Sequence, residues 1–348
     1  MSLASLSNAP AQSVTPSLWH RVEGTMEQVA KLKFFNGLEM PMVGLGTWQA
    51  RDDEVRQAVQ QALECGYRHF DTATLYQNEE AIGDVLSKWI SEGKVAREEL
   101  FITTKLPTIG NRAEYVTKYL TTSLKKLQLS YVDLYLIHFP VGCIGKDEND
   151  LQPRDSEGKV VLDMDTDHES LWKAMEEQVD AGRAKSIGIS NFNSAQVERI
   201  MKFCRIQPAN HQVEIHAFHQ QKELRAVCHK HNITMCAYGP LGAPYKEGAK
   251  QKPVLKHPVV TSMAARLGKT PAQILLRHLI QLNIVVIPKS SNPDRLKQNF
   301  EVFDFKLSDD DMRELDNLDQ GIDGKLFIFS DSMIGVKKHP EFPFNIPF

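Results

Sequence analysis

Four polar residues at the ends of apolar runs are suited to acid–base chemistry. Asp71 ends the run that begins at Tyr67, Tyr76 lies on the loop just beyond it, and Lys105 and His138 follow the next two runs. A lysine ammonium stabilises a phenolate and so lowers the pKa of a phenol, which is ordinarily near 10. A carboxylate would keep that lysine charged, and a neutral histidine could orient a carbonyl oxygen. We expect such a set to donate a proton to an oxygen that becomes alkoxide-like, an effect commonly worth ~10²–10⁴-fold.

Each of these residues also has an ordinary explanation. Asp71 could cap a turn while Tyr76 merely packs, a strand-end lysine is usually solvated, and a single histidine is usually a packing residue. We favour the chemical interpretation because a barrel fold would bring all four loops to one rim. No metal-ligand spacing is visible in the sequence, so the electrons of a redox reaction would come from an organic cofactor.

A second group, after the last apolar run, is suited to binding an anion. Lys289, Ser290, Ser291 and Arg295 surround a helix start expected near Pro293. Helix N-termini and arginine side chains both favour phosphate groups. The alternative is a solvated basic cap on the helix.

The elements that position these groups follow a rhythm of apolar run, polar loop and amphipathic helix. The apolar runs cover residues 43–47, 67–72, 100–104, 132–137, 185–189, 209–214, 233–238 and 284–287. The helical patterns cover residues 52–65, 79–90, 112–127, 168–181, 194–204, 220–231 and 271–281. Asp52 and Ser194 are the expected N-caps, and Gly66, Gly93 and Gly182 lie just past helix ends.

Continuous apolar strands that alternate with helices indicate a parallel sheet buried on both faces. Eight such units predict an α/β fold with a single closed (β/α)8 TIM barrel, whose chemistry lies at the carboxyl ends of the strands. A doubly wound open sheet is the alternative, and it requires a glycine-rich phosphate turn. The nearest candidate, Gly44-Leu-Gly46, lacks the third glycine and the acid that should follow.

Three segments lie outside this rhythm. Asn36-Gly37 between apolar flanks predicts a two-residue β-hairpin within residues 30–42, which we expect to plug one end of the barrel. Residues 139–166 form a long polar loop, and residues 321–348 form a tail rich in aromatic residues that we expect to pack. Both long segments are expected to shape a substrate pocket.

The composition is that of an ordinary globular protein. The 348 residues are 42% hydrophobic and 24% charged with a net charge of −3, so no basic field favours nucleic acid or an anionic membrane. No apolar run reaches the ~20 residues that span a bilayer. Five scattered cysteines without a CxxC pair argue against a disulfide framework or zinc site and for a reducing compartment. We expect a disordered tail over residues 1–25, with Met26 as an alternative start, and one domain over residues 26–348.

From about Lys31 to its end, the chain resembles the aldo-keto reductase family, in particular the NADPH-dependent aldose and aldehyde reductases. The matching motifs are Gly44-Leu-Gly-Thr-Trp48, Phe70-Asp-Thr-Ala-Thr-Leu-Tyr76, Thr103-Thr-Lys-Leu106, Leu134-Tyr-Leu-Ile-His-Phe-Pro140, Gly188-Ile-Ser-Asn-Phe192, Gln212-Val-Glu214, Ala237-Tyr-Gly-Pro-Leu-Gly242 and Ile287-Pro-Lys-Ser290. The residues and their intervals agree at eight strand ends, which makes the match specific.

The resemblance implies a role for each residue of the first group. Tyr76 would be the general acid, Lys105 and Asp71 would tune it, and His138 would orient the carbonyl that receives hydride from NADPH. The implied substrates are aldehydes, with ketones, sugars and steroids as alternatives. The residues expected to wall the substrate pocket are Trp48, Phe139 and Phe327.

The resemblance also implies a site for NADPH or NADP⁺. Ser190, Asn191 and Gln212 would hold the carboxamide, and Tyr238 would stack on the nicotinamide ring. Thr47 and Leu241 are also implied to bind the cofactor. The residues implied for the adenosine 2′-phosphate are Lys289, Ser290, Ser291, Asn292 and Arg295, and those implied for the adenine are Gln298 and Asn299. A cytoplasmic monomer is expected, with a small-molecule substrate and without a metal, nucleic acid or membrane partner.

Several positions depart from the family pattern. Phe139 replaces a common tryptophan, which removes an indole donor, and His211 replaces a common asparagine. Gly239 and Ala243 replace serines that contact the pyrophosphate in many relatives. Gln49 and Tyr245 occupy the positions of an ion-paired belt that closes over the cofactor in some members, and Gln298 replaces a common glutamate. We therefore predict looser cofactor clamping and faster NADP⁺ release than in belted members.

Two other classes of function stay open at this point. Lys105 could form a Schiff base in an aldolase, although Asp71 would keep the lysine charged and therefore a poor nucleophile. A binding or structural role is also compatible with the fold, because a fold does not define a function.

Overall fold

A computed structural model describes residues 30–243, 253–330 and 332–346 of the chain. The tail predicted over residues 1–25 lies outside these ranges, as do Met26 and Tyr245. No helix in the described ranges is long and apolar enough to cross a membrane.

Eight parallel strands form one sheet whose order follows the chain from β3 to β10. They are β3 (Leu45–Gly46), β4 (His69–Asp71), β5 (Phe101–Leu106), β6 (Val132–Ile137), β7 (Ala184–Ser190), β8 (Asn210–Glu214), β9 (Thr234–Tyr238) and β10 (Ile284–Val286). Val43 bridges to Val286 and Gly46 to Lys289, so the first and last strands meet. The predicted (β/α)8 barrel is confirmed, and the open-sheet alternative is wrong, because an open sheet would leave these two strands as unpaired edges.

The seam between β3 and β10 is short. The Gly44 amide donates to Val286 O at 2.9 Å, and the Val286 amide donates to Met42 O at 2.9 Å. A Cβ atom at Gly46 would lie 2.5 Å from Ile287 O. Only glycine therefore allows the two strands to approach closely enough to close the barrel.

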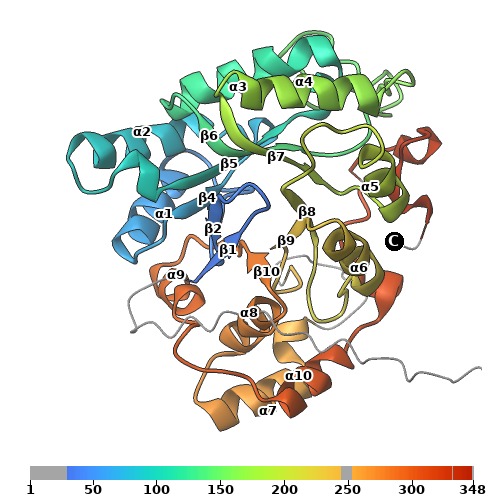
Figure 1. Ribbon diagram of the computed structural model, residues 1–348. Coiled ribbons are helices and arrows are strands. Elements are labelled where there is room, and N and C mark those ends of the chain that lie inside the picture. Colours follow the sequence, from blue (N-terminus) through green and yellow to red (C-terminus); the bar gives the residue numbers. More distant parts are fainter. Residues whose placement is uncertain (1–29, 244–252, 331, 347–348) are drawn as a thin grey trace, which may run out of the picture.

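A ring of helices surrounds the sheet (Figure 1). The α-helices in the described ranges are α1 (Asp52–Glu64), α2 (Glu79–Ser91), α3 (Ala113–Leu127), α4 (His168–Asp180), α5 (Ser194–Ile200), α6 (Lys222–Lys230), α7 (Pro258–Leu267), α8 (Pro271–Gln281), α9 (Pro293–Phe300) and α10 (Asp309–Asp316). Glycines 66, 93 and 182 follow α1, α2 and α4 with left-handed φ angles, as predicted. Helices α7 and α10 were not predicted; α7 buries Val260, Met263 and Ala264, and among its apolar residues α10 buries only Leu315.

The N-caps of two helices lie one residue before the predicted ones. Arg51, not Asp52, is the N-cap of α1, and no side chain caps that end. Asn193, not Ser194, caps α5: its side chain accepts from the Gln196 amide, and the Gln196 side chain accepts from the Asn193 amide. This reciprocal pair satisfies two free amides at once, which the serine could not do from inside the first turn.

The predicted hairpin is present but its turn is longer than two residues. Strands β1 (Lys31–Lys33) and β2 (Glu39–Pro41) pair in antiparallel fashion. The Phe34 amide donates to Leu38 O at 2.8 Å, and the Gly37 amide donates to Phe34 O at 3.0 Å. The turn between Phe34 and Leu38 therefore has three residues. Gly37 takes a φ of 89°, the conformation that a two-residue turn would also have required.

The hairpin closes one end of the barrel, where it crosses the centre of the ring of helices in Figure 1. Phe34 and Met40 are buried in one cluster with Leu134, Leu136 and Val285 from the inside of the sheet. The predicted plug is therefore confirmed. The opposite end, where the strands terminate, is left for the site.

The two long segments pack against each other at that opposite end. The Val160 amide of the loop after β6 donates to Ile334 O of the tail at 2.9 Å. Phe139 and Val141 share a buried cluster with Phe342 of the tail. The tail therefore packs through its aromatic residues, as predicted.

Candidate active site

The centre of the site is the ammonium of Lys105, near the end of β5. Its Nζ atom donates to Asp71 Oδ1 at 2.6 Å, to Thr72 O at 2.9 Å and to Tyr76 Oη at 3.3 Å. Strands β4 and β5 are neighbours with Asp71 opposite Thr103, so the register of the sheet brings the carboxylate to the lysine. The Lys105 and Asp71 side chains are 0% and 2% exposed, so water does not weaken the pair.

Tyr76 and His138 reach this centre from two further loops. Tyr76 ends the 3₁₀-turn Thr74–Tyr76 just after β4, and His138 directly follows β6. Their rings meet edge to face with centroids 5.5 Å apart. Asn191 Nδ2 donates to His138 O at 2.9 Å and fixes the backbone there. One carbonyl oxygen could thus contact both the phenol and the imidazole.

The surroundings set the protonation of these groups. Burial raises the pKa of Tyr76, and the opposing effect of Lys105 is smaller, so the phenol loses its proton less readily than predicted. Burial lowers the pKa of Lys105, but Asp71 and Tyr76 together raise it above its ordinary value. Burial, and then Lys105, hold the pKa of His138 well below its ordinary value. At neutral pH the set is therefore a protonated phenol, an ammonium and a neutral imidazole.

Asn78, which the sequence did not single out, joins two loops of the site. Its Oδ1 accepts from Thr72 Oγ1 at 2.7 Å, and its Nδ2 donates to Thr47 O and Ala50 O, both at 2.9 Å. Thr47 Oγ1 in turn donates to Asp71 O at 2.9 Å. One buried amide thus fixes the loop after β3 to the loop after β4. Its place directly before α2 was the available signal, because asparagine is a common residue before a helix.

The residues predicted to hold a nicotinamide lie on β7, β8 and β9 or directly after them. They are next to Asp71, Tyr76, Lys105 and His138, which we call the tetrad. Tyr238 Oη donates to Asn191 Oδ1 at 2.7 Å, and Asn191 Nδ2 donates to Ser190 Oγ at 3.0 Å. Gln212 Nε2 donates to Asp71 Oδ2 at 2.7 Å. The structure therefore brings this group into direct contact with the catalytic candidates.

The residues predicted to bind a 2′-phosphate lie on the loop after β10 and the first turn of α9. Asn292 Oδ1 accepts from the Arg295 amide at 3.0 Å and caps the helix, and Ser290 Oγ accepts from the Asn292 amide at 3.2 Å. Lys289 Nζ donates to Glu54 Oε1 of α1 at 2.9 Å, a contact that the sequence did not predict. Four other residues predicted to bind the cofactor are half-buried or buried: Leu241, Ser291, Gln298 and Asn299.

A dinucleotide would fit between these two groups. Hydrogen-bonding side chains lie at one end and two cationic side chains at a helix N-terminus lie at the other. Gly239 directly follows β9 with a φ of 60°, and a Cβ there would lie 3.1 Å from the Phe327 ring, so this position favours glycine. Within the described residues, no group of three or more histidine, cysteine, aspartate or glutamate side chains could hold a metal ion.

Aromatic side chains predicted to wall a substrate pocket lie around this rim. Trp48 and Tyr238 both contact Phe327, with ring centroids 6.0 and 5.5 Å apart. Phe139 is buried and contacts Phe329 at 5.2 Å. The tail thus brings Phe327 between the loop after β3 and the end of β9.

Glu214, at the end of β8, anchors the start of that tail. Its carboxylate accepts from the amides of Leu326 at 2.6 Å and Phe327 at 3.1 Å, and from Lys325 Nζ at 3.2 Å. It also contacts His216 Nε2 at 3.1 Å. Glu214 belongs to one of the strand-end motifs, but its partners in the tail lie more than one hundred positions away and gave no local signal.

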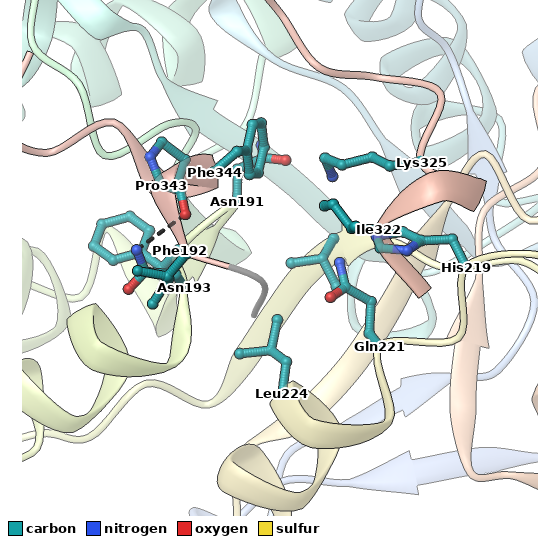
Figure 2. Close-up of a pocket in the computed structure, with 12 residues that line it drawn as sticks. Asn191, Phe192, Asn193, His219, Gln221, Leu224, Ile322, Lys325, Pro343 and Phe344 are labelled. Atoms are coloured by element: carbon teal, nitrogen blue, oxygen red, sulfur yellow. Dashed lines mark hydrogen bonds between the residues drawn. The ribbon is translucent and has the colours of Figure 1, made fainter. Parts of the chain in front are cut away.

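A pocket lies beside this anchor, between the tail and the loops after β7 and β8 (Figure 2). Lys325, Ile322 and Phe344 line it from the tail, and His219 lines it from the loop after β8. Asn191 alone belongs both to its lining and to the predicted site. The pocket is therefore a side cavity and not the space above the tetrad.

His211, one of the departures from the expected pattern, has a supporting role. Its Nε2 accepts from the Phe192 amide at 3.1 Å, and the ring is fully buried. Asn191, next to that amide, has a left-handed φ of 64°. His211 therefore stabilises the turn that presents Asn191 to the site.

Comparison with known proteins agrees with this geometry. The model of the "Aldo/keto reductase family" matches residues 42–320. Aldo-keto reductase family 1 member A1-A of Danio rerio is 42% identical over 327 residues, 92% of this chain and 99% of that protein. Member C18 of Rattus norvegicus is 41% identical over 326 residues, 91% of this chain and 98% of that protein. The solved structure of the aldose reductase from Schistosoma japonicum superposes with a TM-score of 0.84 at 42% identity, covering 92% of this chain and 100% of that one.

Proposed function

Because this chain belongs to the aldo/keto reductase family, we propose that it is an NADPH-dependent reductase that acts on the carbonyl carbon of aldehydes. The cofactor supplies the hydride when bound. The observation that carries the proposal is the buried contact of Lys105 Nζ with both Asp71 and Tyr76, at 2.6 and 3.3 Å.

Tyr76 is the proposed general acid. As negative charge develops on the carbonyl oxygen, the phenol donates its proton to that oxygen, and the Lys105 ammonium stabilises the phenolate left behind. Asp71 keeps the ammonium charged and oriented. His138, neutral at pH 7, orients the same carbonyl oxygen by donating a hydrogen bond.

The nicotinamide carboxamide would be held by Ser190, Asn191 and Gln212, with the ring against Tyr238. Gln212 donates to Asp71 in the present structure, so its amide is already turned toward the tetrad. Lys289, Arg295 and the capped start of α9 would hold the adenosine 2′-phosphate.

A Schiff-base aldolase is the weaker candidate. A nucleophilic lysine needs a depressed pKa, whereas the pKa of Lys105 is raised and its ammonium is fully buried against Asp71. Borohydride trapping of an adduct on Lys105, without any change in NADPH fluorescence, would reverse this preference.

The test is a panel of aldehydes, ketones, sugars and steroids assayed with NADPH, first with the wild-type protein and then with Tyr76→Phe. We expect aldehydes to give the highest kcat/KM and the phenylalanine variant to lose about 10²–10⁴-fold in kcat, because it lacks the proton to donate. Tyr115→Phe, an exposed tyrosine on α3, is the control and should retain full activity. Undiminished reduction by Tyr76→Phe would refute the proposed mechanism.

Cofactor release is proposed to be fast. Gln49 stands at one position of the ion-paired belt of some relatives, and a neutral amide cannot form that belt. Stopped-flow fluorescence should therefore find NADP⁺ release faster than in a belted relative, and an equally slow release would refute this expectation.

The cellular setting is proposed from the chemistry of the side chains. The five cysteines are unpaired, which fits a reducing compartment such as the cytoplasm. A monomer is the expected assembly, and a mass from light scattering at twice the chain mass of 39.4 kDa would refute it.

A further inference from the structure

A second lysine–carboxylate pair lies inside the proposed phosphate site. Lys289 Nζ donates to Glu54 Oε1 at 2.9 Å. The hydrogen bond from Lys289, and then one from Ser291, lower the pKa of Glu54, so this carboxylate is charged at neutral pH. Two residues proposed to receive a phosphate dianion are thus engaged by an anion of the protein itself.

The packing of the barrel determines this contact. The Lys289 backbone bridges to Gly46 at the seam, only eight residues before Glu54. Helices α1 and α9 lie side by side (Figure 1), and Tyr67 Oη just after α1 donates to Leu296 O of α9 at 2.9 Å. The carboxylate and the ammonium are therefore held near each other by elements that do not depend on their attraction.

The other cation of the site is in a different situation. Arg295 is exposed, and within the described residues its guanidinium has no carboxylate partner. A dianion bound at the start of α9 could pair with Arg295 without displacing any carboxylate. To pair with Lys289, it would have to displace Glu54, and it would then remain close to the Glu54 carboxylate. Like charges at such distances repel, and the repulsion is moderated by solvent because Glu54 is 46% exposed.

We propose that Glu54 determines how strongly this enzyme prefers NADPH over NADH, by competing with the 2′-phosphate for Lys289. The inference rests on the proposed function, because it takes the loop after β10 as the 2′-phosphate site. NADH has a 2′-hydroxyl in place of the phosphate, so Glu54 lowers the affinity for NADH only slightly. The residue thus reduces the preference for the phosphorylated cofactor without contributing to the reaction.

Direct binding of two adenosine fragments tests the inference without any turnover. Calorimetric titration with 2′,5′-ADP and with 5′-ADP would be made on the wild-type protein, Glu54→Gln and Asp53→Asn. Asp53 is the matched control: it lies in the same first turn and carries the same charge, but it is 89% exposed and pairs with Arg56 at 3.5 Å. We expect Glu54→Gln to tighten 2′,5′-ADP binding by about threefold to tenfold and to leave 5′-ADP within about twofold, while Asp53→Asn changes neither by more than about twofold.

A second background isolates the contact. In Lys289→Met, the effect of Glu54→Gln on 2′,5′-ADP should shrink to less than half, because the competed ammonium is gone. Equal tightening of both fragments by Glu54→Gln, no tightening, or an equal effect of Asp53→Asn would overturn the inference while the proposed function stands. If the wild-type protein does not distinguish 2′,5′-ADP from 5′-ADP and reduces no carbonyl with NADPH, the proposed function fails as well.

Discussion

Two lysine–carboxylate pairs lie on neighbouring strands of the same barrel, Asp71–Lys105 at β4 and β5 and Glu54–Lys289 at the seam between β3 and β10. The first joins side chains that are 2% and 0% exposed, with Nζ 2.6 Å from the carboxylate. The second joins side chains that are 46% and 32% exposed, at 2.9 Å. The distances are similar, but the dielectric surroundings differ, and the surroundings decide what each pair can do.

A buried pair is costly to break, because removing one partner leaves an uncompensated charge. It suits a proton-transfer centre that must keep one geometry. An exposed pair contributes little to stability, because water screens it. A ligand can therefore displace one of its partners, and either residue can be substituted without destabilising the fold.

The largest expected difference between the two pairs is in stability. Asp71→Asn should lower the free energy of unfolding by about 3–5 kcal/mol, since Lys105 then stays buried without its counter-ion. Glu54→Gln should change it by less than about 1 kcal/mol. Urea denaturation followed by circular dichroism measures both. Similar losses in the two variants would show that burial does not distinguish the pairs.

A third pair, Glu214–Lys325, tests whether a buried pair can act on the substrate through the tail. Glu214→Gln should also cost about 3–5 kcal/mol of stability, because Lys325 would stay buried without its counter-ion and the Leu326 and Phe327 amides would lose an ionised acceptor. Phe327 should then move, so KM for the carbonyl should rise several-fold while kcat changes less than about twofold.

Hydrogen exchange at the Leu326 and Phe327 amides provides the control for that experiment. These amides should exchange faster in Glu214→Gln than in the wild-type protein. A uniform rise in exchange over the whole barrel, with KM unchanged, would show that Glu214 serves stability alone.

Acid should weaken the buried region before the exposed pair responds. Burial lowers the pKa of His69 and of His211 to about 3, against about 6.5 in the unfolded chain. Below pH 6.5 both rings bind a proton in the unfolded chain but stay neutral in the folded protein. The folded state therefore loses stability as the pH falls from 6.5 toward 3. Each ring should cost about 1–2 kcal/mol by pH 5 in urea titrations, and His211→Asn should reduce the slope. A flat profile between pH 6.5 and 5 would contradict this account.

The smallest expected effect is that of salt. Raising the ionic strength from about 0.05 M to about 0.5 M should weaken 2′,5′-ADP binding several-fold, because the phosphate contacts at Lys289 and Arg295 are exposed. The kcat at saturating cofactor should change less than about 1.5-fold, because the tetrad is shielded. If kcat falls as much as the affinity, the tetrad is more open to solvent than its burial indicates.

The sequence was sufficient to predict that the four side chains of the tetrad lie together, because the signal is local. Asp71, Lys105 and His138 each end or follow an apolar run, and parallel strands bring such positions to one rim. The nature of the centre was predicted less well. The neighbouring ammonium was expected to ease the ionisation of Tyr76, but the extent of burial, which dominates, depends on side chains from several distant segments.

Most of the contacts that were missed join segments far apart in the chain. Glu54 meets Lys289 only because the barrel closes, and Glu214 meets Lys325 only because the tail returns to β8. Asn78 joins nearer loops, but two of its three partners are backbone carbonyls. Every residue has a backbone carbonyl, so the residue types do not reveal these contacts. The tail could be predicted to pack from its aromatic content, whereas its path could not.

The short seam between β3 and β10 has a consequence for how the molecule assembles. Gly46 and Lys289 come from the first and last strands, so their pairing requires the longest loop closure in the barrel and should form late in folding. Asp71, Lys105 and His138 come from the first half of the chain and can meet before that closure. A nascent or truncated chain without β10 could therefore contain the proposed proton-transfer centre and still lack the proposed phosphate site. Cofactor binding would then depend on completed folding, and a bound cofactor would stabilise this short junction of the barrel by mass action.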